Sequence, residues 1–85
     1  MKAIVRVILR ENVNDTHGAS VKSGLHLLGF TQVNQVRYGR LFQLDLEDTD
    51  PDLARERVAQ MCDKLLANLL IEQYEIEIID GKKVR

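Results

Sequence analysis

Hydrophobic and polar residues follow two different periods along this chain, and the clearest change between them lies in residues 50–79. In the first part of this range, apolar residues recur mostly three or four residues apart, which predicts an amphipathic helix. The residues of this apolar face are Leu53, Val58, Met61, Cys62, Leu65 and Leu69. Asp50 is placed to cap the helix, Pro51 suits its first position, and Asp52 lies near the positive end of its dipole.

The period becomes two after Asn68, a residue that tolerates the left-handed conformation with which many helices end. This alternation predicts a strand with one face exposed to solvent. One face consists of Glu72, Tyr74, Ile76 and Ile78, and the other of Gln73, Glu75 and Glu77. We interpret the three glutamates as solvating residues that also discourage an edge strand from pairing with another chain, rather than as an acid/base pair.

Residues 2–10 alternate in the same way and predict the first strand of the chain. The residues expected to face the core are Ala3, Val5, Val7 and Leu9. The other face is unusual, because Ile4 and Ile8 lie among basic residues where a solvated strand would be polar throughout.

A second helix is predicted after the polar residues 11–18, where Asp15 or Thr16 can cap its first turn. Its apolar stripe is formed by Val21, Leu25 and Leu28. Gly29 is placed just past its end, where glycine commonly closes a helix.

Residues 32–38 favour a strand by composition, although their apolar residues keep no clean period. Gly39 and Arg40 then supply a predicted turn, and residues 41–47 alternate as a further strand. The sequence therefore predicts a β-hairpin between the two helices.

The predicted order is strand, helix, strand, strand, helix, strand, which is the α+β, ferredoxin-like βαββαβ arrangement: a four-stranded antiparallel sheet with both helices on one face. Right-handed crossovers would place the first and third strands in the middle of the sheet. Ile4, Ile8 and Leu41 then lie on the open face as an exposed apolar patch, and we expect the chain to self-associate through them as a homodimer or higher homo-oligomer.

The composition is that of an ordinary globular domain. The 85 residues are 45% hydrophobic and 29% charged, with a net charge of -1, which gives no general attraction to nucleic acid or anionic membrane. We expect one domain, residues 1–85, with residues 81–85 as a mobile tail. The absence of a long apolar run or a signal-peptide pattern, together with one unpaired cysteine, indicates a cytoplasmic protein.

Candidate chemistry is sparse, and the sequence predicts no catalytic residue, no metal site and no cofactor site. Cys62 lies on the apolar helix face and is interpreted as core, and a lone cysteine excludes CxxC motifs. His17 and His26 have neither the spacing nor the surroundings of a metal pair. The open sheet face lacks the aromatic residues with which this fold stacks RNA bases, so nucleic-acid binding is disfavoured. Arg37 and Arg40 flank a single glycine and could hold an anion or a partner's carboxylate.

A run of residues at the end of the helix before the last strand carries a family resemblance. It consists of Cys62-Asp63-Lys64-Leu65-Leu66-Ala67-Asn68, followed by Ile71-Glu72 and Tyr74. This run closely resembles the helix-to-strand signature of the PurS family, the small subunit of phosphoribosylformylglycinamidine (FGAM) synthase in de novo purine biosynthesis. The similarity covers the whole chain and includes Asp15, Gly18, Leu27-Leu28-Gly29-Phe30 and Val36-Arg37-Tyr38-Gly39-Arg40. Two residues depart from the pattern, since Thr16 and Arg40 stand where the family commonly has proline and lysine.

The resemblance implies a subunit with no catalytic site of its own. In that family the complex makes formylglycinamidine ribonucleotide from formylglycinamide ribonucleotide, ATP and glutamine, with the chemistry on a synthetase subunit, PurL, and a glutaminase subunit, PurQ. The small subunit dimerises, bridges these two subunits and supports ammonia transfer. By analogy we expect Arg37, Gly39 and Arg40 to dock to the larger subunits.

Two other classes of function remain open from the residues alone. The first is a regulatory domain of ferredoxin-like type that binds a small molecule against the loop Asn14–Gly18. The second is a small enzyme of the acylphosphatase kind, whose arginine-bearing phosphate cradle is poorly matched by residues 12–18.

Overall fold

A computed structural model describes residues 1–47 and 49–79, and the predicted tail, residues 81–85, lies outside this part of the chain. The elements in chain order are β1 (Lys2–Leu9), α1 (Thr16–Leu27), β2 (Gly39–Asp45), α2 (Pro51–Met61), a π-helical turn η1 (Cys62–Leu66) and β3 (Glu72–Ile79). The described chain is therefore an α+β fold with three strands and two α-helices.

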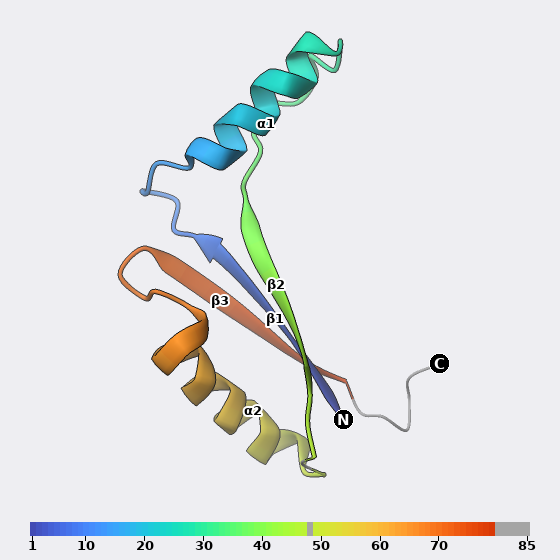
Figure 1. The fold of residues 1–85 in the computed structure, drawn as a ribbon, viewed down its shortest axis with the longest axis vertical. Coiled ribbons are helices and arrows are strands. Elements are labelled where there is room, and N and C mark those ends of the chain that lie inside the picture. Colours follow the sequence, from blue (N-terminus) through green and yellow to red (C-terminus); the bar gives the residue numbers. More distant parts are fainter. Residues whose placement is uncertain (48, 80–85) are drawn as a thin grey trace.

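The three strands form an antiparallel sheet in the order β2-β1-β3, with α2 against one face (Figure 1). Val5 at the middle of β1 lies opposite Phe42 of β2 and Ile76 of β3, which sets the register of the whole sheet. Because side chains alternate between faces, Val5, Phe42 and Ile76 point to the same side as α2.

The core lies between β1 and α2, as the alternation of the first strand predicts. Ala3, Val5 and Val7 are buried, and they pack against Val58 and Cys62 of the second helix. Residues of the flanking strands complete the cluster and are only partly buried: Phe42, Leu44, Leu46, Tyr74, Ile76 and Ile78. A core this small depends on each of its members.

The buried stripe of α2 differs in part from the predicted one. Ala54, Val58 and Cys62 are buried at spacings of four, whereas Leu65 is 83% exposed. The cause is η1, in which the N–H of Ala67 donates to the carbonyl of Cys62, 3.0 Å away, and so adds one residue to the turn. Leu66 rather than Leu65 consequently packs against the core.

The helix starts are confirmed. The Asp15 side chain accepts a hydrogen bond from the N–H of Gly18, and Asp50 accepts one from the N–H of Asp52, with Pro51 in the first turn. Gly29, with φ of 100°, follows the end of α1 in the left-handed region. Asn68 is not left-handed; its side chain accepts from the N–H of Leu70 and shapes a turn instead.

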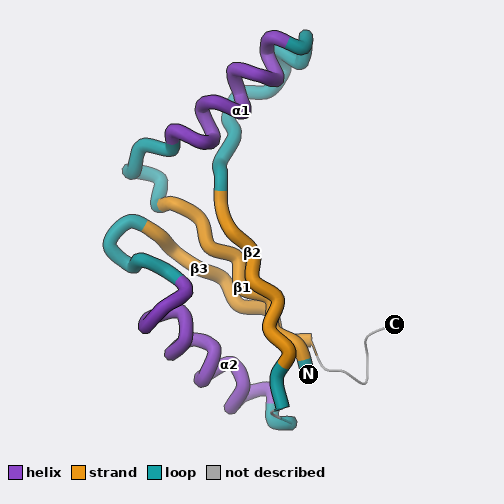
Figure 2. Tube along the Cα trace, viewed as in Figure 1, coloured by secondary structure: helices purple, strands orange, loops and turns teal. Residues whose placement is uncertain are grey.

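The predicted strand at residues 32–38 is wrong, and the sheet within the described residues has three strands rather than four. Figure 2 shows this segment as a loop that runs back beside α1. Two of its backbone groups are bound there, since the ring of His26 hydrogen-bonds the carbonyl of Val33 at 2.8 Å and the N–H of Tyr38 donates to Asp15. The third predicted strand, now β2, is consequently an edge strand in this sheet rather than a central one.

Helix α1 does not lie on the sheet beside α2, so the expectation of two helices on one face is also wrong. It extends beyond the end of β1 and contributes no residue to the described core (Figure 1). The radius of gyration is 16.2 Å, whereas a compact chain of this length has about 12 Å. The described chain is extended because α1 lies beyond the end of the sheet rather than on its face.

We expect Cys62→Ala to lower the free energy of unfolding by about 1–2 kcal/mol, because it removes a fully buried side chain from the centre of the core. Gln60→Ala, two residues away on the exposed face of α2, is the matched control and should change stability little. Urea denaturation followed by circular dichroism measures both. An equal effect of the two substitutions would contradict the assigned core.

Candidate interaction site

The segment from Arg37 to Arg40 leads into β2 and is not an exposed hairpin turn. Gly39 lies so close to β1 that a Cβ atom there would clash with the backbone carbonyl of Val7. This close approach, rather than a turn, is the reason for glycine at the start of β2. The segment therefore holds β2 against β1 at the end of the sheet nearest α1.

Arg40 points to the α2 side of the sheet and joins three parts of the chain. Its Nη2 lies 2.9 Å from Oε1 of Glu72 and 2.9 Å from the carbonyl oxygen of Leu66. The same Oε1 accepts from the N–H of Asn68 at 2.7 Å. Glu72 is 8% exposed, so the interpretation of this glutamate as a solvating residue is wrong. A buried carboxylate needs a paired charge and hydrogen-bond donors, and this cluster supplies both.

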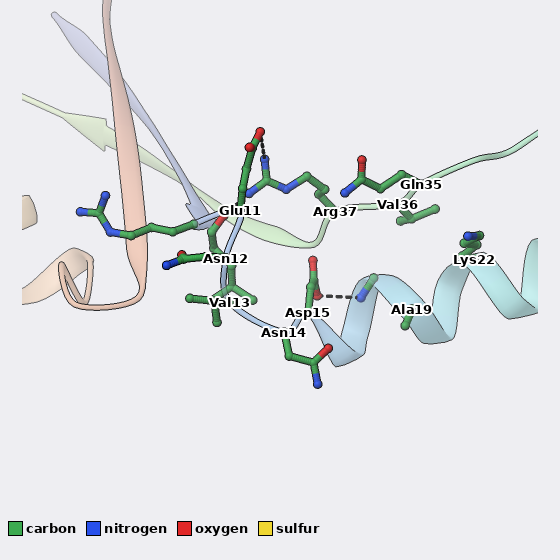
Figure 3. A pocket seen from close by; sticks show the side chains of 13 residues that line it. Glu11, Asn12, Val13, Asn14, Asp15, Ala19, Lys22, Gln35, Val36 and Arg37 are labelled. Carbon is green, nitrogen blue, oxygen red and sulfur yellow. Dashed lines mark hydrogen bonds and ion pairs between the residues drawn. The ribbon is translucent and has the colours of Figure 1, made fainter.

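Arg37 is also bound within the chain. Its Nη2 donates to the carbonyl of Leu9, and its Nη1 lies 4.0 Å from Oε2 of Glu11. Figure 3 shows the side chains of Arg37 and Glu11 pointing toward one another across a cavity of about 470 Å³. This cavity is lined by the end of β1, the Asn14–Gly18 loop and residues 35–37.

The cavity is at the loop that a small-molecule regulatory domain would use, and it is lined by three basic residues, Arg10, Lys22 and Arg37. Both arginines are occupied by groups of the chain. Arg10 donates from Nε and Nη2 to the carbonyl of Leu69, at 3.2 and 3.0 Å. Arg37 is held by Leu9 and Glu11 as described above. These guanidinium groups link loops of the chain to one another. The arrangement therefore favours a structural role for the two arginines over anion binding.

Asp15 fixes the start of α1 to the segment before β2. One carboxylate oxygen accepts from the N–H of Gly18 and the other from the N–H of Tyr38, both at 2.8 Å. These two hydrogen bonds, that from Tyr38 first, lower the pKa of Asp15. The rings of His17 and Tyr38 stack at 4.5 Å between centroids, and a Cβ at Gly18 would clash with the carbonyl of Val36. These contacts hold the start of α1 so that the helix points away from the sheet.

The open face of the sheet carries the predicted patch of Ile4, Ile8 and Leu41. Leu41 is 60% exposed and lies opposite Arg6, diagonal to both isoleucines, although on an edge strand rather than a central one. Arg6 interrupts the patch, but its guanidinium is drawn toward β3 by Glu77 at 2.8 Å and Glu75 at 3.7 Å. Ile4 and Ile8 therefore lie on either side of Arg6 along β1, and Leu41 lies beside Arg6 on β2, on the same face.

Other candidate chemistry is accounted for by packing. Burial raises the pKa of the Cys62 thiol, with a smaller contribution from Asp63, so it is held in the unreactive neutral form. Tyr74, whose pKa is raised mainly by burial, donates to Asp63 at 3.1 Å and ties β3 to η1. Among the described residues, no three histidine, cysteine or acidic side chains cluster as metal ligands would. No helix in this part of the chain is long and apolar enough to cross a membrane.

The sequence did not identify Glu72 and Asp15 as residues that link distant parts of the chain. A charged residue on the apolar face of a predicted strand was the available signal for Glu72, since that face is otherwise formed by Tyr74, Ile76 and Ile78. No comparable signal marks the second partner of Asp15, because Tyr38 is distant in sequence.

The fold and these surfaces define a small α+β assembly module, in which charged groups build joints and apolar groups remain exposed for contacts. The PurS family model, described as phosphoribosylformylglycinamidine (FGAM) synthase, matches residues 2–80. The chain belongs to this family, the small subunits of FGAM synthase in purine biosynthesis.

Individual relatives agree with this assignment. The PurS subunit of FGAM synthase from Synechocystis sp. is 46% identical over 74 residues, which are 87% of this chain and 74% of the relative. The crystal structure of Methanocaldococcus jannaschii PurS is 33% identical with a TM-score of 0.85, covering 93% of this chain and 95% of that one. A chain in the structure of PurLQS from Thermotoga maritima is 29% identical with a TM-score of 0.84, covering 92% and 95%.

We expect Asp15→Asn to remove a pH-dependent part of the stability. The pKa of Asp15 is lowered from its ordinary 3.8 by folding, so its charged form stabilises the fold. This contribution is fully present above pH 3.8 and is lost as the pH falls through the lower folded value.

Urea denaturation of the wild type and the variant across the acid range measures this contribution. The difference in unfolding free energy between them should be constant near neutral pH and shrink in acid. A difference that stays constant down to about pH 2 would contradict the two hydrogen bonds to the carboxylate.

Proposed function

We propose that residues 1–85 form a single domain that acts in the cytoplasm as a non-catalytic subunit of FGAM synthase. In this role the chain bridges a synthetase subunit, PurL, and a glutaminase subunit, PurQ, and supports ammonia transfer between them. The complex would convert formylglycinamide ribonucleotide, ATP and glutamine to formylglycinamidine ribonucleotide. The observation that carries the proposal is the match to a chain of the Thermotoga maritima PurLQS structure over 92% of this chain.

The use of the chain's own polar groups supports a role without catalysis. Arg40 and Glu72 form an ion pair beside Asn68. The two carboxylate oxygens of Asp15 accept hydrogen bonds from backbone N–H groups. Cys62, the thiol of the chain, is buried in the core. A nucleophile or general base must instead be free to reach a substrate.

Affinity purification of the tagged chain from its native lysate, followed by mass spectrometry, tests the proposal. We expect a glutamine amidotransferase and a large ATP-using synthetase to co-purify with it. Recovery of neither protein, under conditions that keep other complexes intact, would contradict the assignment as a bridging subunit.

Docking to the larger subunits is proposed to involve the surface around Arg37, Gly39 and Arg40. Arg40→Glu is unsuitable as a test, because it would place a second carboxylate beside buried Glu72. Arg37→Glu is better suited, because its acidic neighbour Glu11 is exposed and 4.0 Å away, so that the new carboxylate is not buried beside another; the substitution also removes the hydrogen bond to the carbonyl of Leu9. We expect this variant to remain folded and to recover less PurL or PurQ.

Lys2→Glu, a charge reversal at the opposite end of β1, is the matched control for Arg37→Glu. Recovery of both larger subunits should be unaffected by it. Equal recovery by the wild type, Arg37→Glu and Lys2→Glu would show that this end of β1 and β2 is not a docking surface.

Self-association through the open face is proposed from the patch formed by Ile4, Ile8 and Leu41. Burial of such side chains contributes about 1.5–3 kcal/mol each, and a symmetric contact buries the set twice. We expect Ile4→Glu with Ile8→Glu to lower the mass measured by light scattering without changing the helix content. Gln60→Glu, on the exposed side of α2 and away from the open face, is the control. A double variant of unchanged mass would place the contact elsewhere.

A further inference from the structure

The turn between η1 and β3 presents three successive apolar side chains to solvent. Leu69 is 42%, Leu70 is 88% and Ile71 is 40% exposed, and none of the three belongs to the described core. We call these three residues the apolar turn. Turns in solvent are normally built from glycine, proline, asparagine, aspartate and serine, and a run of exposed apolar residues in a folded chain normally serves a function.

Hydrogen bonds fix the backbone of the apolar turn. The side chain of Asn68 accepts from the N–H of Leu70 at 3.2 Å, and the carbonyl of Asn68 accepts from the N–H of Ile71 at 3.1 Å. Arg10, which follows β1, donates from its guanidinium to the carbonyl of Leu69 and from its backbone N–H to the carbonyl of Ile71. The apolar side chains are therefore exposed on a backbone that is already ordered.

This order favours the binding of a partner protein. A flexible loop loses conformational entropy when it is immobilised in an interface, and a turn that is held beforehand avoids much of this cost. The transfer of leucine and isoleucine side chains from water to an apolar pocket is favourable in proportion to the area that is buried. The apolar turn thus has the properties of a preformed anchor.

The charge beside the turn defines the chemistry of the partner. The guanidinium of Arg10 is exposed, and within residues 1–47 and 49–79 it binds the uncharged carbonyl of Leu69 and forms no ion pair. A carboxylate at the rim of a partner's apolar pocket complements this charge. A lipid surface matches less well, because the chain has a net charge of -1 and the apolar turn carries no aromatic residue.

We propose that the apolar turn inserts into an apolar pocket, with a carboxylate at its rim, on a larger subunit of FGAM synthase. This inference rests on the proposed function and adds a second contact surface to it. The turn lies at the same end of the sheet as Arg37, whose Nη2 donates to the carbonyl of Leu9, the residue before Arg10 (Figure 1). One partner surface can therefore extend over both.

Binding of the purified chain to purified PurL and PurQ, under conditions in which the wild type forms the complex, tests the proposal. Leu70→Glu should weaken binding to one of the two subunits by about tenfold or more, because it places a carboxylate in an apolar pocket beside another carboxylate. Leu70→Met keeps an apolar side chain of similar volume and should bind as the wild type does.

Gln73→Glu is the matched control, because it adds the same charge at an exposed position three residues further on and removes no apolar side chain. It should bind both subunits as the wild type does. Unchanged affinity of folded Leu70→Glu for both subunits would overturn the proposal. A lower mass of Leu70→Glu by light scattering would also overturn it, because the turn would then serve self-association.

A photoreactive side chain identifies the pocket. With p-benzoylphenylalanine in place of Leu70, we expect a covalent product with PurL or PurQ at a peptide that contains apolar residues and an aspartate or glutamate. Cross-links confined to a second copy of the chain would overturn the proposal.

Vesicles of phosphatidylethanolamine and phosphatidylglycerol separate the lipid alternative. Co-sedimentation of the wild type, but not of Leu70→Glu, with these vesicles would assign the turn to a membrane and overturn the proposal. If the wild type binds neither PurL nor PurQ, the proposed function itself is contradicted. If the wild type binds them and Leu70→Glu binds equally well, only the inference about the apolar turn is contradicted.

Discussion

The structure depends on the burial of one face of a narrow sheet. The central strand β1 places Ala3, Val5 and Val7 against Val58 and Cys62, and the rest of the fold is arranged around this contact. Helix α2 is the only helix of the described chain that lies on this face, and it leaves the β2 side partly uncovered. Chains of this length bury only about 60–65% of their unfolded surface even when compact.

Charged residues build the joints of this molecule. The cluster of Arg40, Glu72 and Asn68 fastens the turn after α2 to the sheet, and Asp15 fastens α1 to the segment before β2. The contacts of Asp15 fix the direction of α1, whose apolar stripe contributes nothing to the described core. This is the arrangement that a subunit with a structural task requires, because its partners must meet surfaces held in fixed positions.

The features that were predictable from the sequence are those set by neighbouring residues. The alternation of β1, the cap and proline at the start of α2, and glycine after α1 each act within a few residues. The shifted stripe at Leu65 was not predictable, because the extra residue of η1 is accommodated by the packing of Leu66.

Contacts between distant residues account for the other differences. Residues 32–38 have the composition of a strand but pair with no strand among the described residues. The carbonyl of Val33 binds His26 of α1 instead, and the N–H of Tyr38 binds Asp15 at the N-cap of α1. The ion pair between Arg40 and Glu72 joins β2 to β3 across the sheet. No pattern among neighbouring residues of the sequence predicts this contact. The direction of α1 follows from Asp15 and Tyr38, which only the folded chain brings together.

Amide hydrogen exchange tests most directly whether the fold depends on the contact between β1 and α2. Amides of β1 should exchange slowest, because this strand is paired on both sides and its side chains form the core. Amides of α1 should exchange faster in dilute protein, because this helix contributes no residue to the described core. Protection of α1 in dilute protein that equals that of β1 would contradict this account.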